Sequence, residues 1–223
     1  MLHTLAAVGP MAAAWGAHSL WMRRRLTAAR RDPLSGLWTR EAFESRAIHT
    51  LARRPHVAVI LCDLDGFKAV NDTHGHAAGD AAIRAAAGSL TDALDGRPGA
   101  VAARLGGDEF AAVVPLDDPL ALPWLLGGLH DEMTAPFRHA GRDLTVGASI
   151  GAAISSDLNP AAVSRPAEAL ATLLRLADEA MYAVKRTGGG WHYPAATTPT
   201  RGTTAGRRTG RPGTHTTHRK GAA

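Results

Sequence analysis

The stretch that decides the fold is Val57-Ala-Val-Ile-Leu-Cys-Asp63, a short apolar run rich in β-branched side chains. Such a run is typical of a strand buried inside a sheet. Asp63 and Asp65 stand at its end, on either side of Leu64. Because alternate residues of a strand point to the same side of the sheet, the two carboxylates are predicted to face one way.

A second acidic pair, Asp108 and Glu109, lies in a predicted hairpin turn between apolar runs at 100–105 and 109–115. If this hairpin pairs beside the first strand, Asp108 approaches Asp63. Two carboxylates about 4 Å apart repel each other by roughly 4 kcal/mol at an effective dielectric of about 20. A magnesium ion reverses that sign, since hard cations take oxygen ligands. We therefore expect these acids to hold metal against a triphosphate; the alternative is that the first pair simply ends its strand and caps the next segment of the chain.

The residues after the first strand suit a nucleotide. The glycine-containing turn at Gly66 lets backbone N–H groups face phosphate, and Lys68 adds positive charge beside it. Asn71 and Asp80 carry the acceptors and donors that the edge of guanine requires. Taken alone, Asn71 is a helix cap and Asp80 is a surface charge.

The remaining periodic segments predict four helices and one further strand. The helices are 39–54, 76–94, 119–135 and 167–186, and the strand is 143–154. The resulting order is helix, strand, helix, hairpin, helix, strand, helix. It favours an α/β (α+β) domain with a mixed central sheet and helices over one face.

Three parts are predicted along the 223 residues: an apolar segment (1–31), a folded domain (32–190) and a basic tail (191–223). Residues 1–22 are interpreted as a membrane anchor, a helix that pairs with a second copy, or a loosely ordered leader. If they form an anchor, the arginines after it place the domain in the cytoplasm, tethered to the inner face of the cell membrane. Large apolar residues almost vanish in the tail, which predicts disorder from about residue 194.

The composition disfavours some classes of protein. Much of the excess charge behind the net +5 lies at the two ends of the chain, and no aromatic residues interleave with these basic stretches. A nucleic-acid-binding protein, or a structural protein at a membrane, is therefore disfavoured. Cys62, the single cysteine, lies in the apolar run and is interpreted as a core residue rather than a nucleophile.

Four motifs, in a fixed order over residues 32–187, together resemble the GGDEF family of diguanylate cyclases. One five-letter match would be weak, whereas four motifs in order are specific. They are Asp32-Pro33-Leu34-Ser35-Gly36-Leu37-x-x-Arg40-x-x-Phe43, Asp63-Leu-Asp65-Gly-Phe67-Lys68-x-x-Asn71-Asp72-x-x-Gly75-His76-x-x-Gly79-Asp80, Arg104-Leu105-Gly106-Gly107-Asp108-Glu109-Phe110 and Ala177-Asp178-x-Ala180-Met181-Tyr182-x-x-Lys185.

The resemblance implies a ferredoxin-like palm fold similar to nucleotidyl cyclases. It also implies an enzyme that joins two GTP molecules into cyclic di-GMP for second-messenger signalling, releases pyrophosphate, and uses Mg²⁺ or Mn²⁺. Each domain of the family holds one GTP, so an active homodimer is expected. The acceptor of the proton is left open among Asp108, Glu109 and bulk water.

The family's site residues carry over onto positions of this chain. The metal positions match Asp63, the backbone oxygen of Leu64, Asp108 and the neighbouring acid Glu109; Asp63, Asp108 and Glu109 are also the expected catalytic residues. The substrate-binding positions match Asn71, Asp80, Phe67, Lys68, Gly106, Gly107 and Lys185.

Two positions depart from the family pattern. In the product-inhibition motif Arg-x-x-Asp, Arg97 is kept but Ala100 replaces the acid, so weak product inhibition is expected. Gly189 stands where many members have an arginine near the γ-phosphate, so either GTP binds less tightly or Arg186 substitutes. The alternative function is a catalytically weak domain that senses GTP or cyclic di-GMP; the intact acids argue against it.

Overall fold

One five-stranded mixed sheet organises the part of the chain that the computed structural model describes, which is residue 15 and residues 30–194. The strand order is β2-β3-β1-β6-β7, and a separate two-stranded sheet pairs β4 with β5. The strands are β1 (Val57–Asp65), β2 (Val101–Gly106), β3 (Glu109–Pro115), β4 (Phe137–His139), β5 (Arg142–Leu144), β6 (Gly147–Ile154) and β7 (Gly190–His192). The helices are α2 (Arg40–Leu51), α3 (Phe67–His74), α4 (His76–Leu94), α5 (Leu122–Thr134), α6 (Pro160–Val163) and α7 (Pro166–Lys185), with 3₁₀ turns η1 (Pro119–Ala121) and η2 (Ser155–Asp157).

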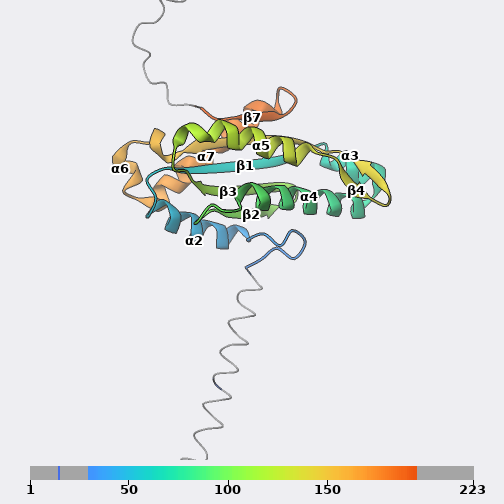
Figure 1. Ribbon diagram of the computed structural model, residues 1–223, viewed down its shortest axis with the longest axis horizontal. Coiled ribbons are helices and arrows are strands. Elements are labelled where there is room, and N and C mark those ends of the chain that lie inside the picture. Colours follow the sequence, from blue (N-terminus) through green and yellow to red (C-terminus); the bar gives the residue numbers. More distant parts are fainter. Residues whose placement is uncertain (1–14, 16–29, 195–223) are drawn as a thin grey trace, which may run out of the picture.

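Strand β1 lies at the centre of the sheet, side by side with β3 (Figure 1). It pairs antiparallel with β3 on one side and with β6 on the other. This register places Asp63 opposite Glu109 and opposite Ser149. The end of β1 is therefore the point where the acids of the hairpin meet the acids of the first strand.

Helices cover both faces of the sheet, so the expectation of helices over one face is wrong. One core cluster joins Ile60, Cys62 and Leu64 of β1 to buried residues of α4 and α5. The other joins Val59 and Leu61 to buried residues of α2 and α7. The physical reason is the continuous burial of β1, because a strand with a single buried face would alternate apolar and polar residues.

The element boundaries agree with the sequence for the long elements and differ for the short ones. The helix predicted at 76–94 is confirmed as α4. The strand predicted at 143–154 is instead two strands, β5 and β6, which belong to different sheets. The sequence did not predict α3, β4, α6 and β7, which are all short.

Other expectations concern the core and the ends. Cys62 is buried, as predicted, and burial, together with the charge of Asp63, raises the pKa of its thiol far above the ordinary value. None of the helices formed by residues 30–194 is both long and apolar enough to cross a bilayer. Apart from residue 15, the predictions for residues 1–22 fall outside the described residues, as does nearly all of the tail.

Helix α7 packs directly on β6 at Gly151, where an added Cβ would overlap the backbone of Ala177 and Met181. We predict that Gly151→Ala lowers the free energy of unfolding by at least about 2 kcal/mol, because neither backbone can yield without moving the helix. Urea denaturation measures this change. The matched control is Gly88→Ala in α4, where an added Cβ meets no atom; it should stabilise the protein by about 0.5–1 kcal/mol. An equal loss in both variants would contradict close helix–strand packing at Gly151.

Candidate active site

Two segments far apart in sequence meet at the end of β1. The hairpin β2–β3 pairs beside β1, which is the condition under which Asp108 was expected to approach Asp63, and the amide of Leu64 donates to the carbonyl oxygen of Asp108 at 3.3 Å. Glu109 is the residue of β3 that lies opposite Asp63. The strand pairing thus brings the two acidic pairs together without any help from side-chain contacts.

The end of helix α7 adds a positive charge to this group. Lys185 Nζ donates to Asp63 Oδ1 at 2.5 Å, and the Asp63 side chain is only 9% exposed. This hydrogen bond raises the pKa of Lys185, although partial burial of the amine opposes the increase. The negative charges of Asp63, Asp65 and Asp108 raise the pKa further. The three carboxylates therefore lie close enough to act on one cation.

Asp65 is held by a partner that sequence reasoning missed. Ser149 Oγ lies 2.9 and 2.8 Å from the two carboxylate oxygens of Asp65 and donates to them from a fully buried position on β6. Gly189 packs on the same carboxylate, and an added Cβ there would lie 2.7 Å from Asp65 Oδ2. A single serine in an alternating strand gave no signal of this role.

The turn that carries Asp108 is fixed by a clamp, which we define as Arg104 with its partners Asp32 and Gly107. Arg104 donates to the carbonyl oxygen of Gly107 through Nε at 2.9 Å and Nη2 at 2.7 Å. Its Nη1 donates to the carboxylate of Asp32 at 3.1 and 3.3 Å. Gly107 has φ of +54°, and Gly106 has φ of +149°; glycine adopts these values readily. The clamp links the start of the domain to the acidic turn.

The residues expected to read guanine lie on two consecutive helices. Asn71 is on α3 and Asp80 is on α4, and the two helices pack against each other. The Asn71 side chain lies directly over Gly79, since an added Cβ at Gly79 would overlap its amide group. Asp80 makes only a loose, exposed ion pair with Arg84 at 3.9 Å. The Asn71 side chain therefore lies beside the turn of α4 that carries Asp80.

The phosphate-binding candidates lie at the ends of helices. Gly66, with φ of +76°, precedes the first residue of α3, and Phe67 and the exposed Lys68 form its first turn. Lys185 is the last residue of α7. The structure thus brings Lys185 to the acids, whereas Lys68 lies just beyond the end of β1.

The two departures are also placed. Arg97 is exposed and donates to the backbone oxygen of Ala93 at 3.3 Å. Ala100 follows three residues later in a turn, and its amide donates to the carbonyl oxygen of Arg97. The backbone of Gly189 packs against the Asp65 carboxylate and leaves no room there for a larger side chain. Arg186 is the exposed residue that follows α7.

The donor atoms at the end of β1 suit a hard divalent cation. In residues 30–194, no group of three or more His, Cys, Asp and Glu side chains is already arranged around a metal position. The available donors are nevertheless all oxygen, and three carboxylates raise the pKa of the one ammonium among them. Sites of this chemistry favour Mg²⁺ or Mn²⁺ over softer metals. The residues therefore fit the metal that the resemblance implies.

Comparisons with known proteins point to the same family as the four sequence motifs. The family described as "Diguanylate cyclase, GGDEF domain" matches residues 29–190. An uncharacterized 19.3 kDa protein from Streptomyces ambofaciens is 45% identical over 77% of this chain and 86% of its own length. The diguanylate cyclase DgcP of Pseudomonas aeruginosa is 33% identical over 70% of this chain, but the match spans only 22% of DgcP.

Solved structures show the same fold. A sensory box/GGDEF family protein from Caulobacter crescentus is 38% identical, with a TM-score of 0.60 over 71% of this chain and 99% of that structure. The GGDEF domain of TpbB (YfiN) from Pseudomonas aeruginosa is 33% identical, with a TM-score of 0.64 over 76% of this chain and 96% of that structure. The predicted α+β palm-like fold is thereby confirmed.

Proposed function

Since the chain belongs to the GGDEF family of diguanylate cyclase domains, we propose that it condenses two GTP molecules into cyclic di-GMP and releases pyrophosphate. The observation that carries the proposal is the pairing of β3 beside β1, which brings Asp108 and Glu109 to the end of β1, where Asp63 is bound to Lys185. Several acids around one cationic position suit the binding of a metal-bound triphosphate. Without a metal, the same carboxylates would repel a triphosphate.

Each residue has a proposed role in phosphoryl transfer. The 3′-hydroxyl oxygen of each GTP forms a bond to the α-phosphorus of the other, the bond from each α-phosphorus to its β-phosphate oxygen breaks, and two pyrophosphates leave. When bound, Mg²⁺ or Mn²⁺ would lower the pKa of the hydroxyl and neutralise the developing charge. Asp63, the backbone oxygen of Leu64, Asp108 and Glu109 would hold the metal. The hydroxyl proton passes to Asp108, Glu109 or water.

Lys185 changes partner in this scheme. It is bound to Asp63 in the structure, and a bound triphosphate offers its ammonium group phosphate oxygens instead. Lys68 would contact the phosphates as a second cation. Phe67 and the glycines of the acidic turn would also contact the bound GTP. Each domain holds one GTP, so the reaction requires two copies that face each other. The domain would act where GTP is available, in the cytoplasm.

Guanine recognition gives a prediction of its own. Gly79→Ala should raise the KM for GTP by at least about tenfold and change kcat less, because the new methyl group displaces the Asn71 side chain from Gly79. Steady-state kinetics measure both constants. Gly88→Ala, on the same helix but with open space around it, should leave KM unchanged. An unchanged KM in Gly79→Ala would exclude Asn71 from guanine binding.

The experiment that tests the function uses the full chain with GTP and magnesium chloride. Formation of cyclic di-GMP with release of pyrophosphate supports the cyclase, and the Asp108→Ala variant is the control that lacks one carboxylate. Binding of GTP or cyclic di-GMP without turnover would instead support the sensor, which is the second candidate. Adding cyclic di-GMP to the same assay tests product inhibition, which we expect to be weak because Ala100 offers no carboxylate.

A further inference from the structure

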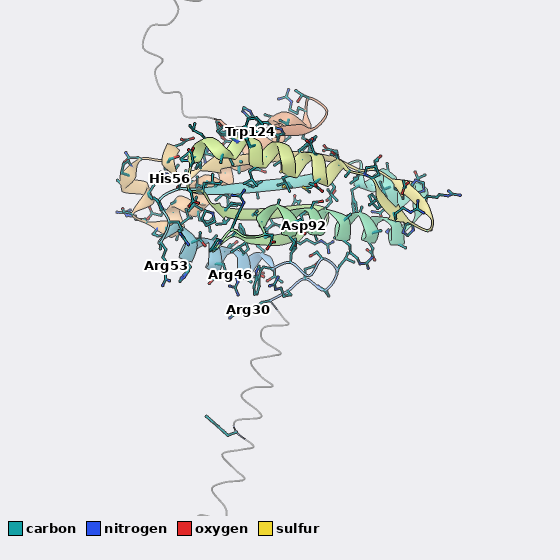
Figure 2. The ribbon with its side chains drawn as sticks, viewed as in Figure 1. Arg30, Arg46, Arg53, His56, Asp92 and Trp124 are labelled. Atoms are coloured by element: carbon teal, nitrogen blue, oxygen red, sulfur yellow. The ribbon has the colours of Figure 1, made fainter. Side chains whose placement is uncertain are left out.

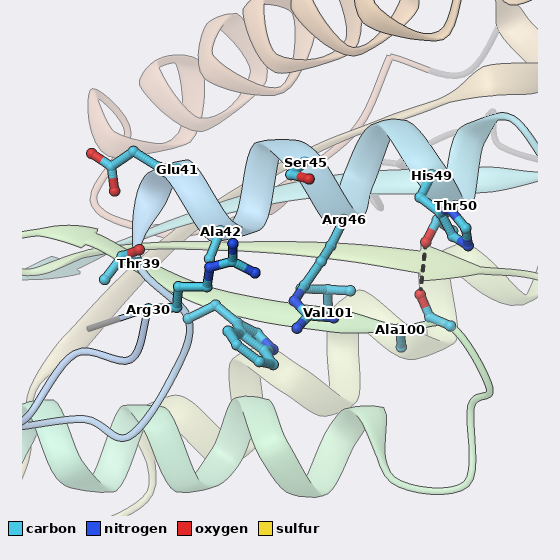
Figure 3. Close-up of a pocket in the computed structure, with 12 residues that line it drawn as sticks. Arg30, Thr39, Glu41, Ala42, Ser45, Arg46, His49, Thr50, Ala100 and Val101 are labelled. Atoms are coloured by element: carbon cyan, nitrogen blue, oxygen red, sulfur yellow. Dashed lines mark hydrogen bonds between the residues drawn. The ribbon is translucent and has the colours of Figure 1, made fainter. Parts of the chain in front are cut away.

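A cavity of about 750 Å³ lies apart from the acidic site, between helix α2 and the first residues of the edge strand β2. Figure 3 shows its lining, in which Arg30 and Arg46 extend into the space between the helix and the strand. The indole ring of Trp38 and the side chain of His49 also line it. The volume lies in the range of sites for small molecules, which is roughly 300–1,000 Å³.

Trp38 fixes by stacking one guanidinium group that lines the cavity, that of Arg46, and one that lies beside the cavity, that of Arg31. The guanidinium carbons of Arg31 and Arg46 lie 3.6 and 3.5 Å from the centroid of the Trp38 ring. Each such cation–π contact stabilises the arrangement by about 0.5–2 kcal/mol. Burial lowers the pKa of Arg31, and the charge of Arg46 lowers it further. The indole thus holds two like charges close to each other.

These charges have no counter-ion within the described residues. None of the ion pairs formed by residues 30–194 includes Arg30, Arg31 or Arg46. Glu41 is the one acid in the lining, and Figure 3 shows its carboxylate pointing away from Arg46. A pocket lined by two guanidinium groups, with a third beside it on Trp38 and its one carboxylate turned away from Arg46, attracts an anion of matching shape.

We propose that this cavity binds a phosphate-bearing small molecule. Arginine presents a planar fork of donors that matches phosphate oxygens, and fixed forks lose less conformational entropy on binding. The hydroxyl groups of Thr39 and Ser45 offer further donors, and Ala42 and Val101 provide an apolar wall for the rest of the ligand. None of these residues belongs to the acidic site, so this site and the cyclase activity can fail independently.

The test is calorimetric titration of the full chain with sodium pyrophosphate in a buffer free of divalent cations. Wild type should bind one equivalent, and Arg46→Gln should lose at least about tenfold in affinity. Arg53→Gln is the matched control, because Arg53 is exposed on the same side of the domain but does not line the cavity (Figure 2). Equal losses in both variants would overturn the proposal, since they would reveal attraction to a basic surface rather than binding in a cavity.

A second pair of variants separates charge from shape. Ser45 is exposed on α2, so neither substitution should disturb the fold. Ser45→Glu should abolish pyrophosphate binding, whereas Ser45→Gln, of the same size, should retain it within about twofold. Retained binding in Ser45→Glu would overturn the proposal.

A lipid source of the phosphate is tested with vesicles of phosphatidylcholine that contain a minor fraction of phosphatidylglycerol. Binding of these vesicles without binding of pyrophosphate would show that the arginines of the cavity bind a membrane surface, and it would overturn the proposal of a small-molecule site. Binding of pyrophosphate without binding of vesicles supports it.

Discussion

Replacing Asp63 by asparagine is expected to lower the rate of cyclic di-GMP formation by about 10²- to 10³-fold. Asparagine keeps the shape of the side chain but removes the charge that holds a divalent cation. The Asp63 side chain is only 9% exposed, so water has little room to replace the missing carboxylate. The amide oxygen of asparagine can still accept from Lys185, but the variant loses the negative charge of Asp63 that helps to raise the pKa of this lysine.

The measurement is the initial rate of product formation at saturating GTP and magnesium chloride. Asp92→Asn is the control, because Asp92 is an exposed acid on α4; its rate should stay within about twofold of wild type. Thermal unfolding of each variant separates loss of chemistry from loss of fold. A rate for Asp63→Asn above half that of wild type would remove Asp63 from the reaction and with it the proposed metal position.

The neighbouring acid has a different environment, which argues against treating the two as equivalent. Both carboxylate oxygens of Asp65 accept from the buried Ser149, and Gly189 closes one side of it. An acid with these partners is held in place and is less free to coordinate a metal than Asp63, whose close partner is Lys185, a lysine with a side chain that is 45% exposed. We infer that Asp63 coordinates the metal ion, whereas Asp65 contributes only its negative charge to the site.

The sequence predicted the elements whose signal is long and periodic. Alanine and leucine at helical spacing placed α4 correctly, and the apolar run at 57–63 placed β1. The same run could have predicted that helices cover both faces of the sheet, because a strand buried on both sides is continuously apolar. The sequence could not predict that the strand is interrupted at Thr145, because the residues on both sides of it are typical of strands. Only the pairing of Leu144 with Phe137 assigns the first part to a separate sheet.

The site was predicted in part because its acids stand in local motifs. The approach of Asp108 to Asp63 was expected only if the hairpin pairs beside β1, and the structure shows that it does. The contact of Lys185 with Asp63 joins residues 122 positions apart, and no periodicity indicates such a contact. Ser149 and the clamp of Arg104 were missed for the same reason, since each acts through a hydrogen bond that only the folded chain creates.

The clamp on the acidic turn carries the second large prediction. Arg104→Lys should lower the free energy of unfolding by about 2 kcal/mol at pH 7 and reduce turnover by at least about tenfold. Lysine keeps the charge but cannot donate to the oxygen of Gly107 and to Asp32 together, because it lacks the planar fork. The turn that carries Asp108 would then lose the two donors that hold it at 2.9 and 2.7 Å.

The comparison variant has the same ion-pair distance in a different environment. Arg138 also lies 3.1 Å from its partner, Asp143, but their side chains are 69% and 61% exposed, against 14% and 21% for Arg104 and Asp32. Arg138→Lys should therefore change stability by less than about 0.5 kcal/mol. Equal effects in the two variants would show that the clamp behaves as an ordinary surface pair.

The pH dependence of the stability loss in Arg104→Lys shows how much of that loss comes from the interaction of Arg104 with Asp32. Burial alone would raise the pKa of this carboxyl, but the hydrogen bonds from Ser35 and Arg104 and the charge of Arg104 outweigh it, and the pKa is lowered from 3.8. A lowered pKa contributes stability that is full above the unfolded value and is lost as the pH falls through the folded value. The difference between wild type and Arg104→Lys should hence be constant from pH 7 to about pH 5 and shrink below about pH 3.8, as measured by urea denaturation across that range. It should not reach zero, because the bonds to Gly107 do not titrate. A difference that grows as the pH falls would contradict the clamp.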